Sequence, residues 1–161
     1  MLTPPLNQTP HIRECTAREE ERRKMTLDLF MAMDPPTVTA QEHQVVVRNG
    51  KPVFYDPPEV KAARLKLIGH LSKFAPDNEL SGPIELVTKW CFPKDRHKNG
   101  EYRITKPDTD NLQKMLKDCM TACGYWEDDC LVCREITEKF WADIPGIYIR
   151  ISQLEEGGYS G

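Results

Sequence analysis

The sequence predicts a single α+β domain in which two main helices accompany a mixed or largely antiparallel sheet. Three observations indicate this class. Several segments alternate apolar and polar residues with the period of a strand, two segments carry apolar residues at helical spacing, and the strands precede, separate and follow the helices without a regular βαβ alternation. A chain of 161 residues also has the length of one domain.

The domain is expected to span residues 25–153, between two segments of different character. Residues 1–24 carry three prolines and a run of charged residues, which indicates an arm that is disordered or briefly helical, and residues 154–161 are expected to form a tail. No apolar run approaches the roughly 20 residues that span a bilayer, and the order of a signal peptide is absent. We therefore expect a cytoplasmic protein without a membrane partner.

The first half of the domain predicts a strand, a hairpin and a helix. The strand begins near residue 25, where every second residue is apolar: Leu27, Leu29, Met31 and Met33. Asn49-Gly50 lies between residues 44–48 and 51–55 and predicts a β-hairpin, because its tight turn requires two residues with positive φ. Prolines then open a helix that ends near residue 74, with apolar residues at helical spacing: Val60, Ala63, Leu67, Ile68 and Leu71.

The second half predicts a strand over 84–92, a polar loop, a helix over 110–123, and two strands over 130–141 and 147–151. The helix has one apolar stripe, formed by Leu112, Met115, Leu116, Cys119, Met120 and Cys123. Its polar face carries Asp110, Lys114 and Asp118 within about 80° of each other. Asp110 at the N-cap with Gln113 three residues later resembles a capping box, and Gly124 suits the position after the helix.

Acidic residues gather at both ends of this second helix. Asp108 and Asp110 stand at its start, and Glu127-Asp128-Asp129 follows its end. Two carboxylates about 4 Å apart repel by roughly 4 kcal/mol at an effective dielectric constant near 20, so a fold that gathers several of them either leaves them in water or binds a hard cation. Mg²⁺, with Mn²⁺ as a possible substitute, could bind Asp108, Asp110 and one carboxylate of Asp128-Asp129 if the later acids fold back beside the helix start.

Other interpretations of these residues remain open. The acids could be a solvated cap and turn, or an Asp-x-Asp nucleotide-sugar site, although no glycine-rich phosphate loop accompanies them. Lys114 lies one turn beyond Asp110, where it could touch a scissile phosphate or stabilise transition-state charge. It could equally form a plain i,i+4 salt bridge worth a few tenths of a kcal/mol.

A basic segment precedes the acidic pair, although the whole chain has a net charge of −3. Residues 89–106 contain six basic and two acidic residues. The cations expected to guide a DNA backbone are Lys94, Arg96, Lys98, Arg103 and Lys106. A basic approach to an acidic site suits metal-dependent cleavage of a polyanion.

The six cysteines are expected to be reduced thiols, and four of them lie close together at positions 119, 123, 130 and 133. Structural zinc is one interpretation of these four. Small core residues are the other, because Cys119 and Cys123 share the apolar helix face and Cys-x-x-Cys on a strand points its two thiols to opposite sides.

The run Lys106-Pro-Asp-Thr-Asp-Asn-Leu-Gln-Lys114, then Asp118, then the segment from Gly124 to Val132 (Gly-Tyr-Trp-Glu-Asp-Asp-Cys-Leu-Val) resembles the RusA family of Holliday junction resolvases. The likeness is specific over 106–132 and looser over the first strand's end and the last two strands. Cys130 and Leu131 depart from the small residue and the glutamine that are frequent in the family.

The resemblance implies a RusA-like fold and a Mg²⁺-dependent endonuclease that resolves four-way DNA junctions as a homodimer by paired nicks, in recombination and repair. It implies metal-binding roles for Asp108, Asp110 and Asp129, an essential role for Lys114 and supporting roles for Asp128 and Asp118. The alternative function is a dimeric module that binds branched DNA without cutting it, and a third is a zinc-stabilised domain.

Overall fold

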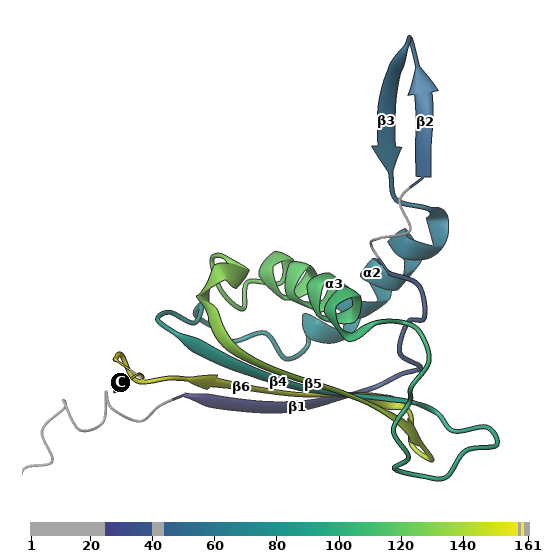
Figure 1. Cartoon of the computed structure of the whole chain (residues 1–161). Helices are drawn as coiled ribbons and strands as arrows, with labels where there is room; N and C mark the ends of the chain where they lie inside the picture. The colour runs from purple at the N-terminus through teal and green to yellow at the C-terminus, as the bar shows by residue number, and fades with distance from the viewer. Residues whose placement is uncertain (1–24, 40–43, 158, 160–161) are drawn as a thin grey trace, which may run out of the picture.

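The computed structural model describes residues 25–39, 44–157 and 159, and it has two layers (Figure 1). A four-stranded sheet has the order β1-β6-β4-β5, and helices α2 and α3 lie on one of its faces. A separate two-stranded sheet, β2-β3, extends away from both layers. The predicted α+β class with a mixed sheet is therefore confirmed. The arm proposed for residues 1–24 lies outside the described residues.

The main sheet is mixed because one pair of strands is parallel. β1 (Thr26–Ala32) and β4 (Ile84–Pro93) both run antiparallel to the strand between them, β6 (Gly146–Gln153). β5 (Val132–Ala142) pairs in parallel with β4. The chain between these two strands forms α3 (Thr109–Ala122) and the short 3₁₀ turn η1 (Asp129–Leu131). This β4-α3-β5 crossover, which was not predicted, determines where the acidic residues lie.

The core lies between the helices and the sheet. The alternation predicted for β1 is confirmed, because Leu29, Met31 and Met33 are buried. The stripe predicted for α3 is confirmed as well, with Cys123 at its partly buried end. Trp90 of β4 and Trp126 after α3 are among the largest side chains with no exposed surface. These contacts hold α3 against the sheet.

Helix α2 (Pro58–Leu71) begins at the prolines, as predicted, and buries Val60, Ala63, Leu67 and Leu71. It ends about one turn before the predicted residue 74. No helix in the described ranges is both long enough and apolar enough to cross a membrane.

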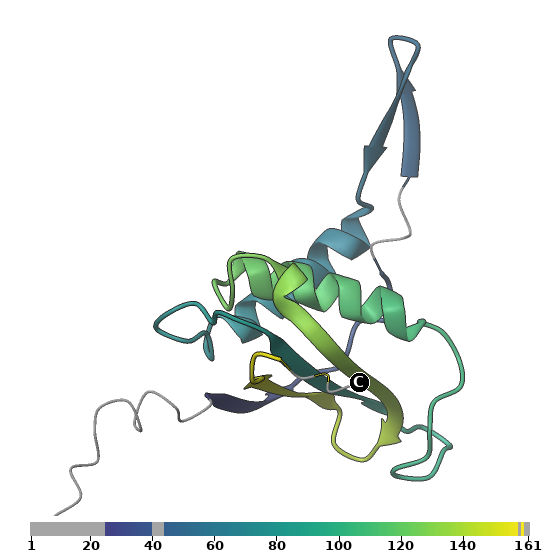
Figure 2. The ribbon, with the colours of Figure 1, turned by 60° about the vertical axis from the view of Figure 1, so that its left-hand side comes forward.

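The predicted hairpin is confirmed as β2 (Gln44–Arg48) and β3 (Lys51–Tyr55), with Asn49 and Gly50 at φ values of 51° and 73°. It stands clear of the rest of the chain in Figures 1 and 2, and residues 45–55 are all exposed. The cross-strand pairs Val45–Phe54 and Val47–Pro52 give it one wholly apolar face.

Tyr125 joins the end of α3 to α2 by a buried hydrogen bond, in which its hydroxyl donates to the Leu71 carbonyl oxygen at 2.8 Å. A Tyr125→Phe variant is expected to lose about 1 kcal/mol of unfolding free energy, because it removes this bond and keeps the ring. Urea denaturation followed by fluorescence measures the change. Tyr159→Phe is the control, since Tyr159 is 91% exposed; equal stability of the two variants would contradict the expectation.

Candidate active site

The helix start differs from the predicted cap. Asp108, not Asp110, is the N-cap residue of α3, and its carbonyl oxygen accepts the first helical bond from the Leu112 N–H at 3.1 Å. The Asp108 side chain makes no capping hydrogen bond. Asp110 lies in the first turn, and both residues are exposed. Their carboxylates form no hydrogen bond or ion pair with the other described residues, so both remain available to a ligand.

Gln113 does not close a capping box, because its side chain is buried against β4. Its Oε1 accepts a hydrogen bond from the Thr88 hydroxyl at 2.9 Å, and the Trp90 indole N–H donates to the same hydroxyl at 3.2 Å. Burial of a polar side chain requires such partners, and these three come from two elements. The network fixes the first turns of α3, and with them the acidic pair, on the sheet.

Lys114 and Asp118 share the helix face that the sequence predicts. Lys114 Nζ lies 4.0 Å from an Asp118 carboxylate oxygen, and the Lys114 side chain is 66% exposed. An exposed pair at this distance contributes little to stability, so the ammonium group remains accessible to a phosphate. Both interpretations of Lys114 fit this geometry.

Arg64 of α2 is a neighbour that sequence patterns did not indicate. Its guanidinium lies 3.6 Å from Asp118 and 3.5 Å from Asp56, the residue that follows the hairpin. Asp118 therefore has cationic neighbours on both α2 and α3. Only tertiary contact between the two helices creates this cluster.

The second acidic cluster lies beyond the far end of α3. The Asp128 carboxylate caps η1 by accepting the Cys130 backbone N–H at 2.9 Å, and this bond holds the pKa of Asp128 below its usual value. Asp129 is the first residue of η1 and is partly exposed. Glu127 is exposed. The Asp128 carboxylate therefore already accepts a hydrogen bond within the turn, whereas Asp129 lies beside it and is partly exposed.

The two acidic clusters are not brought together within one chain. A helix of 14 residues separates Asp108 and Asp110 from the Asp128-Asp129 pair, which corresponds to about 20 Å. The expectation that the later acids fold back beside the helix start is wrong for a single chain. β5 is parallel to β4, so the chain must return to the opposite end of the sheet before β5 begins (Figure 1).

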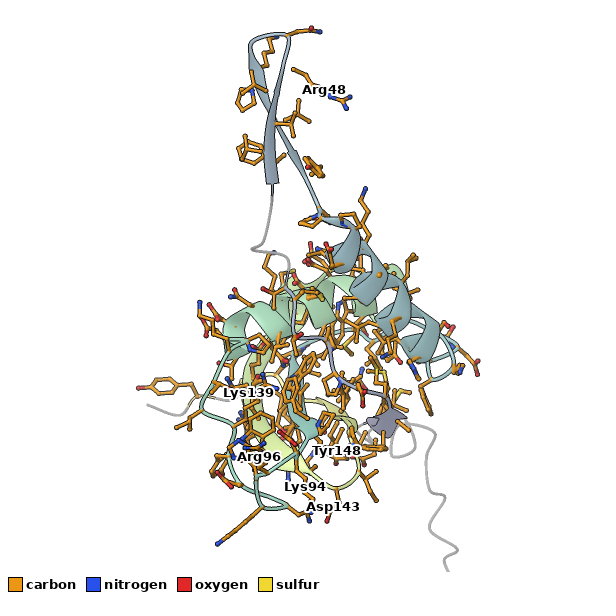
Figure 3. All side chains as sticks on the ribbon, turned by 90° about the vertical axis from the view of Figure 1, so that its right-hand side faces the viewer. Arg48, Lys94, Arg96, Lys139, Asp143 and Tyr148 are labelled. Carbon is orange, nitrogen blue, oxygen red and sulfur yellow. The ribbon has the colours of Figure 1, made fainter. Side chains whose placement is uncertain are left out.

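Residues 94–106 of the basic segment lie in a long loop between β4 and α3, and the cations of this loop have different surroundings. Lys94 forms an ion pair with Asp143 at 2.7 Å, and Figure 3 shows the two side by side with Arg96 nearby. Arg96, Lys98 and Lys106 are exposed. These three remain the candidates for contact with a DNA backbone.

Arg103 has a different environment from the one predicted. Its guanidinium stacks over the rings of Phe92 and Trp141, at 4.1 and 4.6 Å from their centroids, and donates to the Lys106 carbonyl oxygen at 2.5 Å. Burial lowers the pKa of Arg103. The residue is held inside the loop, so we assign it a structural role in place of DNA guidance.

The clustered cysteines lie in two separate places. Cys119 and Cys123 face α2, where their thiols lie 3.9 and 3.8 Å from the carbonyl oxygens of Arg64 and Ile68. Burial raises the pKa of the Cys119 thiol to about 11. Cys130 in η1 and Cys133 near the start of β5 are exposed. Core packing therefore explains Cys119 and Cys123.

The donor chemistry of the acidic pair fits a hard divalent cation. Over residues 25–39, 44–157 and 159, no group of three or more His, Cys, Asp and Glu side chains is placed to hold a metal ion. Mg²⁺ usually keeps several waters and is bound by one or two protein carboxylates together with substrate phosphates. Asp108 and Asp110, both exposed, can meet that smaller requirement.

Comparison with known proteins gives a consistent result. The model of the family Endodeoxyribonuclease RusA matches residues 35–152. The protein YqaN of Bacillus subtilis (strain 168), described as uncharacterized, is 27% identical over 120 residues, which cover 67% of this chain and 84% of that protein. The crossover junction endodeoxyribonuclease rusA of Lactococcus phage r1t is 31% identical over 108 residues, which cover 65% of this chain and 81% of that protein.

The family match includes both acidic clusters, Lys114 and the basic loop, and it spans most of the chain. The chain therefore belongs to the RusA family of endodeoxyribonucleases.

Proposed function

We propose that this protein is a Mg²⁺-dependent endonuclease that resolves four-way DNA junctions as a homodimer by paired, symmetric nicks. The observation that carries the proposal is the exposed pair Asp108 and Asp110 at the start of α3, reached through a basic loop. The name of the phage relative, a crossover junction endodeoxyribonuclease, supports the choice of substrate.

Asp108 and Asp110 would hold the cation, with Mn²⁺ as a substitute for Mg²⁺. When bound, the ion polarises the scissile phosphate and lowers the pKa of a water. Lys114 extends from the next turn of the same helix, with its side chain 66% exposed, and would contact phosphate or the negative charge that develops on it. Asp118 would orient Lys114 across their 4.0 Å contact.

Asp129 would complete a site only in a dimer. Because α3 separates it from Asp108 and Asp110 in its own chain, a second copy must supply it if the three acids act together. A two-fold axis that places the far end of one α3 near the start of its partner's α3 creates two identical sites. Two equivalent sites match the approximate two-fold symmetry of a four-way junction and explain paired nicking.

A cleavage assay tests the function directly. The full chain is incubated with a synthetic four-way junction and Mg²⁺, and in parallel with a chelator. We expect symmetric nicks only with the cation. Junction binding without cleavage under both conditions would instead support a non-cleaving DNA-binding module.

The exposed cations of the β4–α3 loop are expected to contact phosphates. Replacing Arg96 and Lys98 by alanine should reduce the slope of log binding constant against log salt concentration by about 1–2, because each lost phosphate contact removes roughly 0.9. Binding to the junction in chelator, measured over a salt series, gives the slope. Lys61→Ala and Lys73→Ala on the α2 side serve as controls, and an unchanged slope would assign the loop cations to solvent.

A further inference from the structure

Two cations hold the three backbone carbonyl groups that immediately precede the acidic pair. Lys139 Nζ donates to the carbonyl oxygens of Thr105 and Pro107, at 2.8 and 2.7 Å. Arg103 donates to the carbonyl oxygen between them, that of Lys106, at 2.5 Å. Each of three consecutive carbonyls thus receives a charge-assisted hydrogen bond, which is about twice as strong as a neutral one.

Both cations are themselves fixed. Lys139 lies on β5 at the register position of the buried Trp90, which places it on the face of the sheet that carries α3. The Arg103 guanidinium stacks on Phe92 and Trp141, and its backbone N–H donates to the Lys139 carbonyl oxygen at 2.9 Å. Figure 3 shows Lys139 between the loop and α3. A rigid strand therefore supports the segment that leads into the site.

The held segment ends at the acidic pair. Pro107 is buried, Asp108 follows it directly, and the Asp108 carbonyl group begins α3. The position of Asp108, and of Asp110 two residues later, consequently depends on the segment 105–107. Lys139 also lies within electrostatic reach of Asp108: burial and then Arg103 lower the pKa of Lys139, and the Asp108 charge acts in the opposite direction.

We infer that Lys139 is a positioning residue of the active site, which together with Arg103 fixes the backbone from Thr105 to Pro107 and so orients the Asp108 and Asp110 carboxylates for a divalent cation. This inference rests on the proposed function. Groups that orient metal ligands typically contribute 10–100-fold, roughly, to metal affinity or activity. No sequence motif contains Lys139, because it lies on a strand 31 positions from Asp108.

The test compares Lys139→Met, which keeps most of the side-chain length and removes the ammonium group, with Lys139→Arg, which restores donors to carbonyl oxygens. Lys89→Met is the matched control, because Lys89 is an exposed lysine of the adjacent strand β4. Four quantities are measured on the full chain: Mn²⁺ affinity by calorimetry, junction affinity in chelator, and kcat and KM for junction cleavage well below the melting temperature.

For Lys139→Met we expect Mn²⁺ affinity and kcat to fall by about 10–100-fold, with KM and chelator binding unchanged. Lys139→Arg should recover most of the loss, and Lys89→Met should match the parent. A folded Lys139→Met with parental Mn²⁺ affinity and kcat would overturn the inference. So would an Arg variant that is no better than the Met variant, because the loss would then reflect folding alone.

If Lys139→Met does not fold, Arg103→Lys is measured in its place. A lower kcat with parental KM supports the positioning role of the two cations, and parental values of both kcat and KM contradict it. If the parent neither binds Mn²⁺ nor cleaves, the proposed function fails and the positioning role fails with it. A parent that does both, beside an unaffected Lys139→Met, rejects the positioning role alone.

Discussion

An Asp110→Asn variant is expected to lose at least about 10²-fold of the parent's Mg²⁺-dependent junction cleavage. The substitution keeps the shape of the side chain and removes its charge, so it removes one of the two exposed carboxylates at the start of α3. A bound cation contributes several kcal/mol of charge stabilisation, and each 1.36 kcal/mol corresponds to about a factor of ten in rate. Initial nicking rates on a labelled junction measure the effect.

The fold and the DNA surface should survive this change. Asp110 is exposed and forms no hydrogen bond or ion pair with the other described residues, so thermal stability and junction affinity in chelator are expected to equal those of the parent. Glu127→Gln is the matched control, because Glu127 is an exposed acid of the second cluster that has no assigned role. Undiminished nicking by Asp110→Asn would contradict the proposed role of Asp110 in metal binding.

A mixture of two inactive variants should regain activity if the site is shared between subunits. Asp110→Asn and Asp129→Asn are each expected to inactivate both sites of a homodimer. In a mixed dimer with shared sites, one site carries both substitutions and the other carries none. Random exchange makes half of the dimers mixed, so about a quarter of the parent's sites are restored.

The cleavage products of the mixture also show whether each active site is shared between the two subunits. A mixed dimer has one intact site, so it should leave singly nicked junctions without paired cuts, and these separate from resolved duplexes on a native gel. If each subunit used its own three acids, every site in the mixture would carry one substitution and the mixture would stay inactive. Asp110→Asn mixed with itself gives the baseline.

The elements of this fold could be predicted from local sequence. The alternation at Leu29 and Met31, the Asn49-Gly50 turn and the apolar stripe of α3 all reflect interactions between near neighbours, and the structure confirms each. The first residue of α3 could not be predicted correctly from the sequence. The sequence indicated Asp110 as the cap with Gln113 as its partner, but burial of Gln113 against Thr88 removes that pairing.

The candidate site also has some features that local spacing predicts and others that depend on tertiary contacts. Asp108, Asp110 and Lys114 lie within seven residues, so their shared helix end follows from spacing alone. Other contacts join residues that are distant in sequence, and no sequence pattern predicts them. These are the hydrogen bonds of Lys139 and Arg103 to the backbone before Asp108, and the ion pair between Arg64 and Asp118. Arg103 and Arg96 both belong to the basic segment, and the sequence does not distinguish their environments. In the structure, Arg103 stacks on two aromatic rings, whereas Arg96 is exposed.

The sequence by itself determined the α+β class, the two acidic clusters and their likeness to RusA endonucleases, because periodicity, charge and motif spacing are local properties. The tertiary structure alone decided that the clusters lie at opposite ends of α3. A strand parallel to β4 can begin only at the end of the sheet where β4 begins, so the crossover carries Asp129 away from Asp108. Parallel pairing depends on contacts between residues that are distant in sequence, and it is the reason why the proposed site would take its third acid from a second subunit.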